Sequence, residues 1–487
     1  MLLSTSDPAA AAAGLLQEVN WRLQALSAHE PGAALDEVAS GLALLLEGGD
    51  WSLLEIVAGL GQLDESAQPH IRQALKGFLQ SAALKTGRGD VLHASSARFF
   101  GAMAHTCAQV LQRDRYSTKE HGDLMAEVAT RLMRASAGRL KWDHLAYGPY
   151  DATLWAQLGA TFIEATEAGR LTTPVRLRAG RETETSTYRE YVRAVALQCS
   201  GLDQLPVELI DVADRLIHYL LPAMHLGASP VEGARFFVSP AQGGQPRRLV
   251  RALGEDEAAW YFSPLMAERL MGELEVMLRK GVVPGALEGG PGAKERILAC
   301  IRHLRRAWYD TPVSRRHRRH VMGGRIAAVR GFVALRQTLR GGAEEQSLIW
   351  ALRDASVSGL GVLAPLANAG LPQIGELVGL RTDDNGDWRL GMVRRIQRDD
   401  ISQAFVGVET FATSPKMVRA DDGRAPVDVF LCDPLHRGGV LRVVSPFNAL
   451  RAGAALFVAE QGAVQKLKPL GSVWRGSEFE VRTYLVL

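Results

Sequence analysis

Residues 348–363 read LIWALRDASVSGLGVL, and this stretch decides the fold of the C-terminal half. Its two short apolar runs, 348–352 and 359–363, are rich in large and β-branched residues, which is typical of β-strands. Asp, Ser and Gly residues lie between the runs and favour a turn or a glycine bulge. We therefore predict two strands here, joined by a polar segment.

Similar runs continue from Pro312 to the C-terminus. They cover 327–335, 377–380, 388–396, 405–408, 427–431, 440–444, 455–458 and 481–487. Asn385-Gly386 separates two of them, and Asn-Gly is the strongest short signal for a β-hairpin. So many short strands in succession predict a small antiparallel β-barrel followed by a further β-rich segment.

The first half of the chain has a different periodicity. Apolar residues recur every three or four positions over 9–26, 33–46, 71–84, 95–111, 122–140 and 207–225. This spacing gathers them on one face of a helix, so we predict an all-α N-terminal half. Residues 227–311 mix a hairpin near 235–238 with helices over 263–278 and 293–308.

We therefore predict a multidomain α + β protein. Its parts are a helical interaction domain over 1–226, a mixed connecting region over 227–311, a β-barrel over 312–413 and a β-rich extension over 414–487. Such a division agrees with a length of 487 residues, because a domain usually has about 100–200 residues.

Composition excludes several classes of protein. The chain is 47% hydrophobic and 22% charged, with a net charge of +3, as in ordinary globular proteins. We expect no membrane span, since no apolar run approaches about 20 residues, and no secretory signal, since the N-terminus lacks a basic region. The four scattered cysteines (Cys107, Cys199, Cys300 and Cys432) have neither metal-ligand spacing nor a disulfide framework, which favours a reduced, cytoplasmic protein.

A basic motif, SRRHRRH, occupies residues 314–320. Its Arg315 and Arg319 are four residues apart, so both side chains point to one side of the backbone. Two guanidinium forks so arranged can bind phosphate oxygens or the O6 and N7 atoms of guanine, and can stack on a purine. The same spacing also occurs at Arg302 and Arg306, so the motif alone favours a solvated basic face or a general polyanion contact.

A second motif, DASVSG, occupies residues 354–359. The carboxylate of Asp354 can accept hydrogen bonds from a guanine edge, and the hydroxyl of Ser356 can bond a base or a phosphate. Gly359 has no Cβ, so a ligand or a neighbouring strand can approach its backbone closely. By itself, this motif favours an ordinary turn followed by a glycine bulge between strands.

Together and in this order, the two motifs resemble the PilZ domain of bacterial cyclic diguanylate (cyclic di-GMP) receptors, over roughly 312–413. The resemblance implies a β-barrel whose Arg315 and Arg319 clamp the phosphates and guanine faces, while Asp354, Ser356 and Gly359 line the rim. The adjacent cations Arg316 and Arg318 are secondary candidates. One ligand molecule and a stacked pair both remain open.

From this resemblance we expect a non-enzymatic second-messenger receptor without a cofactor or metal. A dianionic ligand would neutralise the mutual repulsion of the clustered arginines and transmit a rearrangement to the helical half, which would bind a protein partner. Asp214 and His218 lie one helical turn apart but lack a nucleophile motif, so we interpret them as structural.

The alternative is a nucleic-acid or polyanion binder that uses residues 294–320. The nearly balanced charge and the lack of aromatic residues among the arginines disfavour nucleic acid as the partner.

Overall fold

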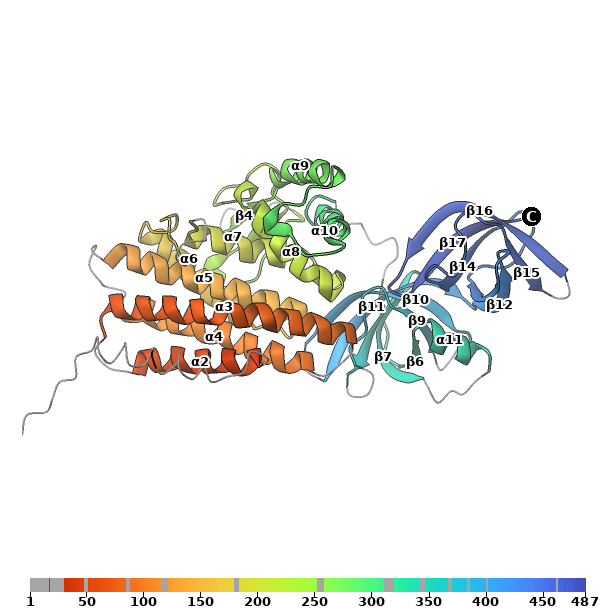
Figure 1. Ribbon diagram of the computed structural model, residues 1–487, viewed down its shortest axis with the longest axis horizontal. Helices are drawn as coiled ribbons and strands as arrows, with labels where there is room; N and C mark the ends of the chain where they lie inside the picture. The colour runs from red at the N-terminus through yellow and green to blue at the C-terminus, as the bar shows by residue number, and fades with distance from the viewer. Residues whose placement is uncertain are drawn as a thin grey trace, which may run out of the picture. The chain divides into compact units, whose positions relative to one another are not determined.

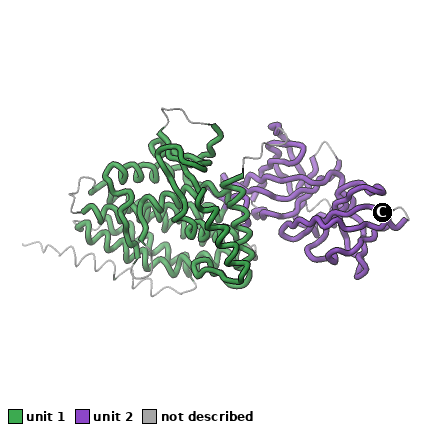
Figure 2. The backbone as a smooth tube through the Cα atoms, turned by 90° about the horizontal axis from the view of Figure 1, so that it is seen from above, with its two compact units in different colours: residues 1–146, 150–202, 207–311 green, residues 147–149, 203–206, 312–487 purple. Residues whose placement is uncertain are grey.

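The computed structural model describes residue 17 and residues 30–47, 51–84, 88–114, 121–178, 184–251, 258–310, 319–341, 347–366, 370–382, 386–399, 402–460 and 463–487. The chain forms two compact units, coloured separately in Figure 2. Unit 1 comprises residues 1–146, 150–202 and 207–311, and unit 2 comprises residues 147–149, 203–206 and 312–487. The predicted fold class, a helical half followed by an antiparallel barrel and a further β-rich segment, is confirmed.

Unit 1 is built mainly from helices. They are α2 (Pro31–Glu47), α3 (Leu53–Leu84), α4 (Arg88–Arg113), α5 (Gly122–Leu145), α6 (Leu154–Glu167), α7 (Thr187–Gln198), α8 (Val207–Leu220), α9 (Ala267–Arg279) and α10 (Ala293–Trp308). Figure 1 shows α2, α3, α4 and α5 alongside one another. Among the described residues, each helix is too short or too polar to cross a membrane.

A small antiparallel sheet also belongs to unit 1. Its order is β1-β4-β2-β3, formed by β1 (His225–Gly227), β4 (Trp260–Ser263), β2 (Phe236–Val238) and β3 (Arg247–Arg248). The pairing of β2 with β3 confirms the hairpin expected near 235–238. The helix expected over 207–225 ends earlier, because Pro222 interrupts it and the chain continues as the 3-10 helix η3 (Leu221–Ala223) and then β1.

The first barrel of unit 2 contains β5 (His320–Val321), β6 (Arg325–Arg330), β7 (Leu348–Ser356), β8 (Gly359–Pro365), β9 (Leu377–Thr382), β10 (Arg389–Arg398) and β11 (Gln403–Thr413). The strands follow the order β5-β7-β6-β9-β10-β11-β8, and pairing of β7 with β8 closes the ring. Alternate residues face the interior, where Val362, Val406 and Val408 are almost completely buried. Strands β9 and β10 form the hairpin that Asn385-Gly386 predicted, although residues 383–385 lie outside the described part.

Residues 327–335 do not form one strand, and this prediction was wrong. Strand β6 ends at Arg330, Gly331 adopts a positive φ of 84°, and helix α11 (Phe332–Leu339) begins. The apolar residues Phe332, Leu335 and Leu339 recur with helical spacing and pack into one core. That periodicity was the signal that the strand prediction overlooked.

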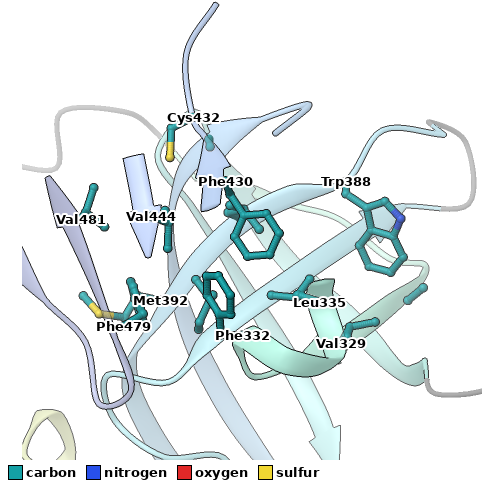
Figure 3. Close-up of a cluster of buried hydrophobic side chains, with 14 residues drawn as sticks. Val329, Phe332, Leu335, Trp388, Met392, Phe430, Cys432, Val444, Phe479 and Val481 are labelled. Carbon is teal, nitrogen blue, oxygen red and sulfur yellow. The ribbon is translucent and has the colours of Figure 1, made fainter. Parts of the chain in front are cut away.

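A second closed barrel follows, in the order β12-β13-β14-β17-β16-β15. Its strands are β12 (Lys416–Asp421), β13 (Pro426–Leu431), β14 (Val440–Pro446), β15 (Leu456–Glu460), β16 (Ala463–Arg475) and β17 (Phe479–Val486). Figure 3 shows the core that α11 shares with it: Phe332 packs on Phe430, with ring centroids 4.7 Å apart, and Phe479 lies in the same cluster. Arg336 of α11 and Arg340, directly after the helix, also form ion pairs with Asp428 of β13. One shared hydrophobic core therefore joins the two barrels of unit 2, while a separate cluster fills the interior of the second barrel.

Two short segments from earlier in the chain belong to unit 2. The backbone amide of Arg398, at the end of β10, donates to the carbonyl of Tyr147 at 2.6 Å. Arg395 of the same strand forms an ion pair with Asp203. Residues 147–149 and 203–206 are therefore attached to β10.

Candidate functional site

The hairpin of β7 and β8 positions the second motif. Ser356 and Gly359 are register partners that close the hairpin, leaving Val357 and Ser358 as a two-residue turn. The Ser356 hydroxyl donates to the Gly359 carbonyl at 3.2 Å, and the backbone amide of Thr410 on β11 donates to the Ser358 carbonyl at 3.1 Å. One hydrogen bond within the hairpin and one from β11 thus fix the hairpin tip.

Strand β5 brings the end of the first motif to this hairpin. His320 and Val321 pair with Ala355 and Asp354, so Arg319 enters beside the end of β7. Its guanidinium Nη1 lies 2.5 Å from Oδ1 of Asp354, and the two side chains are 30% and 25% exposed. This charge-assisted hydrogen bond joins the two motifs and remains open to solvent.

Glycines allow the close approach of these groups. A Cβ on Gly359 would lie 2.8 Å from the Val408 carbonyl oxygen and 3.8 Å from Nη2 of Arg319. A Cβ on Gly361 would lie only 2.7 Å from Oδ1 of Asp354, so the carboxylate occupies the space that a side chain there would fill. Gly361 was not among the predicted residues, although its alternation with Gly359 placed both on one face of a strand.

The structure thus brings Arg319, Asp354, Ser356 and Gly359 together on the outside of the first barrel. Arg315, Arg316 and Arg318 lie outside the described residues, as does His317. The described residues also contain no group of three or more His, Cys, Asp or Glu side chains placed to hold a metal ion.

One further ion pair lies beside the hairpin. Glu409 of β11 is the register partner of Gly359 and forms an ion pair of 2.5 Å with Arg394 of β10. Neither Glu409 nor Arg394 belongs to the two motifs identified in the sequence. Cross-strand register places Glu409 on the same face as Gly359, and register cannot be read from the strands' sequences alone.

The pair Asp214 and His218 has a structural environment. Asp214 is buried and forms ion pairs with Arg193 at 2.8 Å and Lys141 at 3.0 Å. Burial alone would raise the pKa of Asp214, but the positive charges of Arg193 and Lys141 outweigh it and hold this pKa well below its usual range. A carboxylate so paired is a poor proton acceptor.

The basic segment proposed for polyanion binding is partly neutralised within unit 1. Arg305 of α10 forms ion pairs with Glu268 and Glu275 of α9, each at 2.8 Å. Arg296 donates hydrogen bonds to the carbonyls of Pro291 and Gly289. The two ion pairs of Arg305 reduce the positive charge that α10 offers to a polyanion, while Arg296 keeps its charge but is held against the backbone.

The site is an open, charged surface on a barrel wall, an arrangement suited to holding a ligand. Residues 17–230 match the protein family described as "Cyclic-di-GMP receptor FimW, N-terminal domain". The match covers less than half of the 487-residue chain and includes helices α2–α8, but not the barrel. Because that family is one of receptors, the similarity indicates a binding function. No curated protein matches the chain.

Proposed function

We propose that this chain is a bacterial cyclic di-GMP receptor that binds its ligand through the PilZ-like first barrel and has no catalytic role. Two independent observations support this proposal. The helical half matches a cyclic di-GMP receptor family, and the two motifs that resemble those of a PilZ domain occur outside the matched region. The observation that carries it is the contact of Arg319 with Asp354 beside Gly359.

The chemistry of this contact fits a guanine dinucleotide. The carboxylate oxygens of Asp354 can accept hydrogen bonds from the N1 and N2 edge of guanine when Arg319 turns to the ligand. The guanidinium of Arg319 can bind a phosphate or stack on the base, and it is exposed enough to exchange partners. Ser356 offers a further hydroxyl, and Arg315, with Arg316 and Arg318 as secondary candidates, supplies the remaining cations.

Ligand binding would then alter the helical half, which we propose as the part that engages a protein partner. Helix α10 leads directly into the segment that contains Arg315 and Arg319. We propose that a change of partner at Arg319 is transmitted along the chain to α10. The four unpaired, buried cysteines fit a reducing compartment, and we place the protein in the cytoplasm.

Isothermal titration of the full chain with cyclic di-GMP, its linear form and the adenine analogue tests this function. We expect cyclic di-GMP to bind at least 10-fold more tightly than the analogues, and Arg319→Ala or Asp354→Ala to weaken it at least 10-fold. The matched control is Arg437→Ala, an exposed arginine between β13 and β14, which should bind like the parent. Equal affinity for all three nucleotides, or competition by bulk DNA, would favour the polyanion binder instead.

A second measurement tests transmission. Hydrogen exchange in α10 should slow when cyclic di-GMP is added and should not change in Asp354→Ala. Unchanged exchange in the ligand-saturated parent would contradict transmission while leaving binding intact.

A further inference from the structure

A row of four register partners crosses the outer face of the first barrel. Asp354 on β7 pairs with Gly361 on β8, Gly361 pairs with Gly407 on β11, and Gly407 pairs with Arg395 on β10. Directly paired residues point to the same face of a sheet. The row therefore has a carboxylate at one end, a guanidinium at the other and two residues without side chains between them.

A third glycine extends this side-chain-free region. Gly359 lies two residues from Gly361 on β8, and two residues along a strand return to the same face. The residues between and beside them, Leu360, Val406 and Val408, face the barrel interior and are at most 3% exposed. The three glycines thus form an outer floor, which we call the glycine floor (Gly359, Gly361 and Gly407).

Charged side chains border the glycine floor on opposite sides. Arg319 and Asp354 stand on the β7 side, and Arg395 stands on the β10 side, its Cβ 3.4 Å from where a Cβ on Gly407 would lie. With strands about 4.8 Å apart, the ends of the row are roughly 14 Å apart at their Cα atoms. Arginine side chains are long enough to reach inward from such a border. The three glycines are themselves buried, with the Asp354 carboxylate over Gly361 and Arg395 beside Gly407, so a planar ring reaches the floor only when these border side chains move aside.

Each arginine at the border already has a carboxylate partner. Arg319 is paired with Asp354, and Arg395 is paired with Asp203, which belongs to the same compact unit. Arg395 is 50% exposed whereas Asp203 is 12% exposed, so the guanidinium can be reached from solvent while its partner is largely covered. An anion that binds Arg395 must therefore compete with Asp203.

We propose that Arg395 is a further ligand-binding residue, which contacts the cyclic dinucleotide from the side opposite Arg319, and that Asp203 competes with the ligand for it. This inference rests on the proposed function. The ligand carries two phosphates, and the glycine floor separates two cationic borders. When the ligand takes the guanidinium of Arg395, the carboxylate of Asp203 is released and residues 203–206 lose one of their attachments to β10.

Titration of the full chain with cyclic di-GMP tests both parts of the inference. Arg395→Gln, which keeps the aliphatic stem beside Gly407, should bind at least 10-fold more weakly than the parent. Asp203→Asn, which keeps the shape of the side chain but removes its charge, should bind several-fold more tightly. In the double variant, the gain from Asp203→Asn should vanish, because the competing carboxylate acts only through Arg395.

The outcomes separate this inference from the function on which it rests. If the parent does not bind cyclic di-GMP, the proposed function and the inference both fail. If the parent binds and Asp354→Ala loses binding, but Arg395→Gln stays within two-fold of the parent, the function stands and the role of Arg395 is overturned. If Arg395→Gln is weak but Asp203→Asn is no tighter, competition by Asp203 is overturned. Arg437→Ala again controls for loss of one exposed positive charge.

Discussion

The position of the Asp354 carboxylate depends on a neighbouring residue that has no side chain. Its Oδ1 and Oδ2 lie 2.7 and 2.9 Å from the point where a Cβ on Gly361 would be. Real Cβ atoms do not approach oxygen so closely, so any side chain at residue 361 must displace this carboxylate. The displaced group is the end of a side chain that can rotate, so the backbone need not move.

We therefore predict that Gly361→Ala weakens cyclic di-GMP binding about 10-fold, with little change in the melting temperature. Titration and thermal melting of the same preparation measure the two effects. Gly272→Ala in α9 is the matched control, because a Cβ there meets nothing within 4 Å; it should bind normally and gain up to about 1 kcal/mol of stability. Undiminished binding by Gly361→Ala would show that the ligand does not need Asp354 in this position.

His144 is buried in unit 1 and titrates abnormally. Its Nδ1 lies 3.0 Å from the Tyr150 hydroxyl, and burial lowers its pKa to about 4 from the ordinary 6.5. As the pH falls below about 6.5, the unfolded state takes up a proton on His144 before the folded state does. The free energy of unfolding therefore decreases until the pH reaches about 4, where the folded state is also protonated. Burial raises the pKa of neighbouring Asp143 to about 6, which has the opposite sign: that contribution is present at low pH and is lost as the pH rises through 6.

We predict that His144→Asn reduces the acid sensitivity of unit 1, because it removes a group whose full effect is on the order of 3 kcal/mol. Urea denaturation, followed by far-ultraviolet circular dichroism at about pH 7 and about pH 5, measures this. The parent should lose more stability than the variant between these values. An equal loss in both proteins would assign the acid sensitivity to other groups.

At the scale of elements, α11 lies where the two barrels meet. Its first turn carries Phe332, whose backbone amide donates to Glu478 at 3.1 Å and whose ring packs on Phe430 of β13. The helix therefore contributes side chains to the core that joins the first barrel to strands of the second (Figure 3). A cavity in that core should therefore destabilise elements of both barrels.

We predict that Phe430→Ala costs about 3–5 kcal/mol and accelerates hydrogen exchange in α11 and β6 as well as in β13. Phe457→Ala on β15 is the control from the same barrel, because Phe457 is 41% exposed and should matter little. Faster exchange confined to β12–β17 would contradict a shared core.

At the scale of the whole molecule, the four cysteines report on the two compact units separately. Cys107, Cys199 and Cys300 lie in unit 1, Cys432 lies in unit 2, and all four are buried and unpaired. Burial raises the pKa of Cys432 to about 12, and the same cause raises the pKa of Cys107 to about 12. A thiol reacts as its thiolate, so each cysteine reacts only when its surroundings open.

We expect alkylation of the native protein at neutral pH to be at least 100-fold slower than that of a free thiol. In Phe430→Ala, Cys432 should become reactive first, since both residues belong to one core, while the cysteines of unit 1 stay protected. Mass spectrometry of peptides after timed alkylation distinguishes the sites. Simultaneous labelling of all four would show that the two units open together.

Periodicity in the sequence predicted much of this architecture. The helix expected over 293–308 has those bounds, and most strands expected after residue 312 lie within one or two residues of their predicted ends. Apolar spacing reports which side of an element is buried, and that is a local property. The strand prediction was wrong at α11, because we followed the β-rich neighbourhood rather than the helical spacing of the segment itself. The sequence analysis also did not find α7, β12 or β16.

The amino-acid order by itself determined which segments are helices, which are strands, and which residues form the two motifs, because each of these depends on a few neighbouring positions. Only the folded chain decided that Arg319 meets Asp354, and that Gly361, Gly407 and Arg395 continue the row across the barrel. Such neighbours come from strands far apart in the chain, and β10 contains a bulge at Arg394 that shifts every later pairing. Since a shift of one residue would turn each side chain to the opposite face, register had to be observed in three dimensions.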